Sequence, residues 1–173
     1  MLARLVVLSM CRSVVTLSHE AFRCSVYSAG TALTGIRANE RKGQFEMFSF
    51  GSRSLSRLKG IHPDLRKVMD RAIITTDVDF TVLEGLRSIE RQRKLLTSGA
   101  TRTLRSRHLT GHAVDIAPLV DGKVSWDWPI YYRLSPVIKK AAQDVGVKIE
   151  WGGDWRSFKD GPHWQLPWRD YPA

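Results

Sequence analysis

The chain has 173 residues, with 27 Lys and Arg against 17 Asp and Glu, so it carries a formal net charge of +10. Apolar residues make up 43% of it, enough for the core of a single domain, which excludes a wholly disordered chain. No apolar run approaches the roughly 20 residues that span a bilayer, which excludes an integral membrane segment, and the basic charge predicts an anionic partner.

Residues 1–46 differ from the rest of the chain. Both cysteines, Cys11 and Cys24, lie there, so residues 47–173 can form neither a disulfide nor a thiolate metal site. The first 46 residues begin with a short apolar run, at the lower limit for a signal peptide. We expect a disordered leader or a mis-assigned translation start, with the natural start at Met47. Purine codons alone can encode residues 40–43, as in a bacterial ribosome-binding site, which favours the Met47 start.

The first half of the remaining chain predicts two helices and a strand. Residues 49–59 are polar and basic, and we interpret them as irregular. A helix is expected from Pro63, because proline is tolerated at the first helical position. Residues 80–86 predict a strand, and Ser88 is expected to cap a helix over residues 89–97. In the first helix, apolar residues at helical spacing predict a core face: Leu65, Val68, Met69, Ala72 and Ile73.

The second half predicts the rest of a small sheet and one long helix. A basic loop over residues 101–107 precedes a predicted strand over residues 113–118, and Asp121-Gly122 predicts a hairpin turn. Residues 130–145 have a helical pattern, in which Pro136 should cause a kink or mark the true first turn. Two short strands, over residues 148–151 and 163–166, close the domain. No βαβ repetition is present, so the fold class is α+β, a small antiparallel sheet flanked by helices.

Two histidines and an aspartate form a candidate metal site. Two imidazoles and a carboxylate suit Zn²⁺, and three protein ligands leave a position open for water, as in catalytic sites. His108 and Asp115 can share an ion only if the chain bends between them, and Gly111 allows that bend. Residues 161–162 would similarly put a turn between Asp160 and His163, the third candidate ligand. Asp160 would then lie beside the metal without binding it, as a general base.

The residues Ser106-x-His108-x-x-Gly-x-Ala-x-Asp115, followed by Asp160-x-x-His163, resemble the zinc peptidases of bacterial cell walls. That family includes D-alanyl-D-alanine carboxypeptidases and phage L-alanyl–D-glutamate endopeptidases, and its fold is shared with the Hedgehog signalling domain. The resemblance covers about residues 48–166, and residues 51–58 and 151–155 look most like the endolysin branch. It implies one zinc ion per chain, held by His108, Asp115 and His163, with Asp160 as the base. Many members have glutamate at this position, and we interpret the aspartate as typical of the endolysin branch.

Four further side chains are candidates for roles in the site. Arg87 resembles the family arginine near the scissile carbonyl, where it can stabilise developing negative charge. Gln92 is a candidate substrate contact, and Ser106 is a candidate for a hydrogen bond that orients the loop or a ligand. Trp155 is a candidate for substrate binding, with cleft wall as the alternative.

Three other residues have competing interpretations. Asp154 competes with Asp160 for the base role, although a turn or capping role is preferred. His112 occupies a variable position of the motif and is expected not to be a ligand, and His62 is expected only to begin a helix. The arginines of the loop over residues 101–107 form either a solvated surface or an attractive patch for an anionic substrate.

These observations predict that residues 47–173 form a zinc-dependent peptidase that hydrolyses peptidoglycan stem peptides. The expected target is the L-Ala–D-Glu bond, as for a phage or prophage endolysin. D-alanyl-D-alanine carboxypeptidase activity is the alternative, and a non-enzymatic basic wall-binding module is a third hypothesis. No nucleic-acid-binding motif is present, so we expect no nucleic acid partner. We expect a monomer in the host cytoplasm before lysis that acts in the periplasm or at the cell wall, with export to the periplasm as the alternative.

Overall fold

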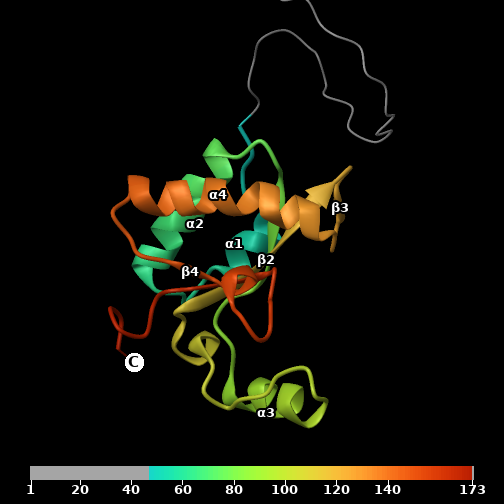
Figure 1. Ribbon diagram of the computed structural model, residues 1–173, viewed down its shortest axis with the longest axis vertical. Coiled ribbons are helices and arrows are strands. Elements are labelled where there is room, and N and C mark those ends of the chain that lie inside the picture. Colours follow the sequence, from blue (N-terminus) through green and yellow to red (C-terminus); the bar gives the residue numbers. More distant parts are fainter. Residues whose placement is uncertain (1–46, 173) are drawn as a thin grey trace, which may run out of the picture. The chain divides into compact units, whose positions relative to one another are not determined.

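An antiparallel sheet organises residues 47–172, the part of the chain that the computed structural model describes (Figure 1). The strands run in the order β1-β2-β5-β4, with β3 paired to the end of β2. The expectations for residues 1–46, a leader or a mis-assigned start, lie outside the described residues. The predicted α+β class is confirmed. The strands are β1 (Phe80–Glu84), β2 (Ala113–Val120), β3 (Lys123–Val124), β4 (Glu150–Trp151) and β5 (His163–Gln165).

The predicted hairpin joins β2 to β3. Asp121 and Gly122 both have positive φ, +50° and +73°, as the tight turns that match strand twist require. Strand β1 contains an irregularity of register, because Val82 pairs with Ile116 but Glu84 pairs with Asp115. The extra residue between them, Leu83, leaves Glu84 paired with Asp115, a residue of the site described below.

Helices α2 (Pro63–Thr75) and α4 (Trp128–Asp144) pack against each other and cover one face of the sheet (Figure 1). The predicted core face of α2 is confirmed, since its five apolar residues are at most 3% exposed. Helix α4 begins before the predicted start and continues through Pro136, so that proline does not mark a first turn. The proline leaves the carbonyl of Tyr132 without its helical donor, and the Ser135 hydroxyl donates to that oxygen at 3.4 Å.

Helix α1 (Ser52–Arg57) corrects our interpretation of residues 49–59 as irregular. It lies along β1, an edge strand with otherwise unpaired backbone groups. The Ser54 hydroxyl accepts from the Val82 amide at 3.1 Å, and Arg57 donates to the Val82 carbonyl at 2.7 Å. These contacts close the exposed edge of the sheet, which is a site of unwanted pairing when open.

Helix α3 (Ile89–Thr97) and the loop after it lie apart from α2 and α4, beyond the end of β1 (Figure 1). The predicted cap is confirmed, since the Ser88 hydroxyl accepts from the Arg91 amide at 3.3 Å. Among the described residues, no helix has the length and apolar character needed to cross a membrane.

Candidate active site

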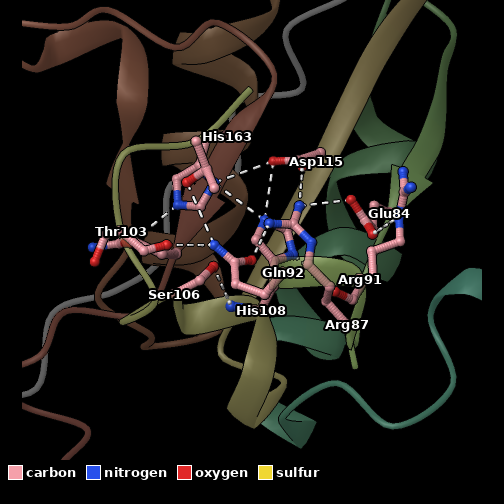
Figure 2. Close-up of polar contacts among 12 residues, drawn as sticks. Glu84, Arg87, Arg91, Gln92, Thr103, Ser106, His108, Asp115 and His163 are labelled. Carbon is pink, nitrogen blue, oxygen red and sulfur yellow. Dashed lines mark hydrogen bonds and ion pairs between the residues drawn. The ribbon is translucent and has the colours of Figure 1, made fainter. Parts of the chain in front are cut away.

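The structure brings the three predicted ligands together (Figure 2). His108 Nε2 lies 3.2 Å from Asp115 Oδ1, His163 Nδ1 lies 3.1 Å from the same oxygen, and the two nitrogens are 3.3 Å apart. Tetrahedral zinc with ligands at about 2.0–2.1 Å places its ligand atoms roughly 3.3 Å apart. The three atoms therefore have the spacing of ligands that share one such ion.

The sheet and one glycine determine this convergence. Asp115 and His163 are opposite each other in the β2–β5 pair, so antiparallel register places their side chains on the same face. Val114 and Trp164 alternate with them and point into the core, so the site lies on the sheet face opposite α2 and α4. His108 comes from the short 3-10 helix Arg107–Thr110, which Gly111 ends with φ +70°. The bend predicted at Gly111 is confirmed.

The outer nitrogen of each imidazole has its own acceptor. His108 Nδ1 donates to the Gly85 carbonyl at 2.8 Å, and His163 Nε2 donates to Gln165 Oε1 at 3.0 Å. The orientation of the Gln165 amide is determined by its Nε2, which donates to Glu150 at 2.7 Å. In a neutral imidazole whose single proton is on the outer nitrogen, the other nitrogen has a free lone pair. Both lone pairs then face the space beside Asp115 Oδ1, as in zinc sites whose histidines are oriented by an outer acceptor.

The chemistry of these three atoms suits a metal ion. Two imidazole lone pairs and one carboxylate oxygen face a single point, and neutral histidines place no hydrogen among them. Such a set of acceptors is stable around a cation. Gly85 and Gln165 were missed from the sequence. The signal for Gln165 was its position two residues after His163 on a strand, which puts both on one face.

The Asp115 carboxylate is strongly stabilised. Burial alone would raise its pKa, but in the metal-free protein hydrogen bonds and positive charge from His108 and His163 hold the pKa well below its usual range. The neutral tautomers described above are those that a bound cation would select. The pKa of His163 moves the other way: burial would lower it, but Asp115 raises it overall. Asp115 is therefore ionised at neutral pH and available as an anionic ligand.

Asp160 lies outside the ligand group but shares its cleft, a hollow of about 600 Å³. Burial raises the pKa of Asp160, and the nearby Asp115 carboxylate raises it further against the lowering effect of His163 and His108. The Asp160 amide donates to the Gly152 carbonyl at 3.0 Å, and a side chain at Gly152 would overlap the backbone of Asp160. The glycine therefore permits the close approach that places the candidate base beside the ligands.

Asp154 lies on the surface instead. It is exposed, and its carboxylate pairs with Lys139 at 2.7 Å. Because it does not line the cleft, Asp160 is the aspartate of the two that can reach a reacting water there.

Arg87 and Gln92 form a connected pair next to the ligands (Figure 2). Arg87 donates to Glu84 at 2.6 Å and Gln92 at 2.7 Å, and its Nη2 lies 3.4 Å from Asp115 Oδ2. Gln92 is fully buried and donates to the Thr103 carbonyl at 2.7 Å. Arg87 lines the cleft, whereas the observed contacts of Gln92 are with the protein, so its contact with substrate stays a prediction.

The remaining candidates lie around this centre. The hydrogen bond expected of Ser106 is present, since its hydroxyl accepts from the His108 amide at 3.3 Å and orients the loop. The Trp155 ring lies 5.1 Å from the His163 ring and lines the cleft. His112 is outside the ligand group, as expected, and bonds to Thr110. His62 caps α2 through the Asp64 amide, as expected.

The arginines of the loop over residues 101–107 differ in their surroundings. Arg107 is 2% exposed and donates to the Leu166 carbonyl from two nitrogens, so it is structural rather than solvated. Arg102 and Arg105 are exposed, lie over the rings of Phe158 and Trp168, and line the cleft. These two remain available to an anionic substrate.

Tyr131 is a neighbour that the sequence did not indicate. Its side chain is 3% exposed, and its hydroxyl has no hydrogen-bond partner within residues 47–172. Burial, with the charges of Asp160 and Asp115, raises the pKa of Tyr131 to about 12. The phenol therefore stays protonated near the two carboxylates.

The known proteins to which this chain is similar are L-alanyl-D-glutamate peptidases and endopeptidases. The sequence model of the family described as phage L-alanyl-D-glutamate peptidase matches residues 46–165. The L-alanyl-D-glutamate peptidase of Escherichia phage T5 is 31% identical over 117 residues, 65% of this chain and 85% of that protein. The peptidoglycan L-alanyl-D-glutamate endopeptidase CwlK of Bacillus subtilis is 30% identical over 124 residues, 61% of this chain and 73% of that protein. The crystal structure of the Serratia marcescens L-Ala D-Glu endopeptidase ChiX superposes with a TM-score of 0.70 and 48% identity, covering 76% of this chain and 98% of that one.

Proposed function

The chain belongs to the phage L-alanyl-D-glutamate peptidase family, and we propose that it cleaves the L-Ala–D-Glu bond of peptidoglycan stem peptides with one zinc ion held by His108, Asp115 and His163. It is a peptidase that acts on peptidoglycan, so the hypothesis of a non-enzymatic binding module is set aside. The observation that carries the zinc proposal is the convergence of three metal-binding atoms at 3.1–3.3 Å, with both outer nitrogens held by acceptors.

The chemistry divides between the ion and the side chains. Bound zinc would polarise the scissile carbonyl and lower the pKa of water toward 7. Asp160 lines the cleft beside the ligands and is assigned the base role: it accepts the proton of the attacking water and passes it to the leaving amine. Arg87 is assigned the stabilisation of negative charge on the carbonyl oxygen, supported by its place in the cleft next to Asp115.

The shape of the site supports an endopeptidase. A second hollow of about 520 Å³ meets the cleft at Glu84, Asp115 and Asp160, so open space extends from the ligand group in more than one direction. An endopeptidase must hold chain on both sides of the scissile bond, whereas a carboxypeptidase needs room for only one terminal residue. This favours cleavage within the stem peptide over release of a terminal D-Ala.

We further propose that the protein is a monomer, accumulates in the host cytoplasm before lysis, and acts in the periplasm or at the wall. The similarity to a phage T5 peptidase supports this location, whereas CwlK and ChiX come from bacteria and favour the alternative of export. Light scattering tests for a mass of 19.6 kDa, and fractionation of cells before lysis tests the location.

The test is digestion of purified diaminopimelate-type peptidoglycan by the full chain, with metal content measured on the same sample. We expect one zinc per chain and fragments with new D-Glu amino termini, abolished by a chelator and restored by Zn²⁺. Release of free D-Ala would reassign the enzyme to the carboxypeptidases. Absence of any product from folded, zinc-loaded protein would refute the proposed activity.

A further inference from the structure

Exposed aromatic side chains gather in a hollow next to the candidate base. This hollow, of about 340 Å³, shares Asp160 with the cleft and is lined by Trp126, Trp128 and Phe158. Those three side chains are 62%, 37% and 52% exposed. Large aromatic rings that stay exposed together at a concave surface mark a binding site more often than chance.

The rings come from separate segments and are partly held in place. Trp126 lies between β3 and α4, and Trp128 is the first residue of α4. The Trp128 ring packs against the rings of Tyr131 and Tyr132, with centroids 6.1 and 5.6 Å away. Because the orientation of Trp128 is set before any ligand arrives, little ordering entropy is lost on binding.

The charge around the hollow differs from that of the two neighbouring hollows. Among the described residues that line it, the charged ones are Lys159 and Asp160. The cleft of the ligand group and the second hollow hold more cations, and in both these face the carboxylates of Glu84, Asp115 and Asp160. The cations are Arg87, Arg102, Arg105 and Arg107 in the first, and Arg57, Lys59 and Arg91 in the second. The aromatic hollow has a single cation to offer an acidic group, fewer than the other two, and its aromatic surface suits an uncharged group.

The groups on the two sides of the scissile bond also differ in charge. On one side, D-Glu and the diamino acid after it carry free carboxylates. On the other side, L-Ala is joined through a lactyl amide to N-acetylmuramic acid, whose carboxylate is consumed by that amide. Only one residue and the lactyl group separate the bond from the sugar, so the sugar must lie within roughly 10 Å of the reacting carbonyl.

Resting on the proposed L-Ala–D-Glu activity, we propose that Trp126, Trp128 and Phe158 form a binding site for the N-acetylmuramyl residue that carries the stem peptide. The C–H faces of a pyranose are weakly positive and stack on the negative faces of aromatic rings. The hollow adjoins Asp160, so a sugar seated there leaves L-Ala to reach the ligand group. The enzyme therefore prefers stem peptides that are still attached to glycan.

Two substrates test this preference with the full, zinc-loaded chain. One is the disaccharide bearing L-Ala-γ-D-Glu-diaminopimelate, and the other is the same tripeptide with an N-acetyl group in place of the sugar. We expect kcat/KM for the first to exceed that for the second about tenfold, and Trp126→Ala to reduce this ratio severalfold. Ile74→Ala, an exposed apolar residue of α2 away from the cleft, is the control and should leave the ratio unchanged.

A binding measurement separates this inference from the proposed activity. We expect N-acetylmuramyl-L-alanine to shift the indole N–H signal of Trp126 in NMR spectra, assigned with Trp126→Phe. A shift without any cleavage would refute the peptidase proposal but support the sugar site. Equal kcat/KM for both substrates, or a ratio unaffected by Trp126→Ala with no indole shift, would overturn the sugar site while the peptidase activity stands.

Discussion

Replacing Gln165 by leucine tests whether the contact behind His163 controls metal binding. Gln165 is 7% exposed, accepts from His163 Nε2 at 3.0 Å and donates to Glu150 at 2.7 Å. Leucine has a similar size but no acceptor, so the imidazole loses the group that sets its tautomer and orientation. Packing in the strand should otherwise be preserved.

The magnitude follows from the energy of one buried hydrogen bond. A buried donor left without an acceptor costs about 1–3 kcal/mol. The metal-bound state bears this cost in full because zinc on Nδ1 keeps the proton on Nε2, whereas a neutral metal-free imidazole can carry its proton on Nδ1, toward Asp115. Loss of such outer partners typically weakens metal binding about 10–100-fold, which corresponds to about 1.4–2.7 kcal/mol. We therefore expect the zinc Kd of Gln165→Leu to rise 10–100-fold.

The assay is competition for zinc against a chromophoric chelator, with circular dichroism as the check of folding. Gln143→Leu is the matched control, because Gln143 is an exposed residue of α4. The exchange variant Gln165→Glu with Glu150→Gln restores an acceptor for His163 and should recover tight binding. A folded Gln165→Leu protein with the wild-type Kd would refute this account of the site.

Three more outcomes are expected. Asp160→Asn should retain zinc and lose about 10²–10⁴-fold in peptidoglycan turnover, while Asp154→Asn keeps full activity; equal rates would remove Asp160 from the mechanism. Gly111→Ala should lower the unfolding free energy in urea about 1–3 kcal/mol more than Gly122→Ala, because both have positive φ but only Gly111 would overlap a backbone oxygen, that of Gly60. Metal-free protein should lose stability as the pH rises above about 6.5, because the raised pKa of His163 stabilises the fold below its unfolded value and this is lost as the pH rises through the higher folded value. Zinc should reverse that slope, since binding requires neutral imidazoles; urea titrations with and without zinc decide both signs.

Several elements were predictable because local chemistry specifies them. Helix α2 has a proline start and an apolar stripe, and the Asp121-Gly122 turn needs two residues that tolerate positive φ. The candidate ligands were also visible, since few residue types bind zinc and the bend between His108 and Asp115 required a residue such as Gly111.

Other features arise only when distant segments meet. Helix α1 was missed because its polar residues are stabilised by the edge of β1, through contacts between Ser54, Arg57 and Val82. Helix α4 continues past Pro136, where packing against α2 and a serine hydroxyl compensate for the lost backbone bond.

The site, too, has features that the sequence predicted and features that only the tertiary structure determined. Residue type, spacing and the resemblance together marked the candidate metal ligands, because imidazole and carboxylate have specific affinity for zinc and the motif fixes their positions. The Gly85 carbonyl that orients His108 had no such mark, since every residue has a carbonyl. Its role, and the pairing of Asp115 with His163 across β2 and β5, depend on register between strands far apart in the chain. That register is selected by burial of a whole sheet face, a property of the assembled domain that short-range sequence patterns do not contain.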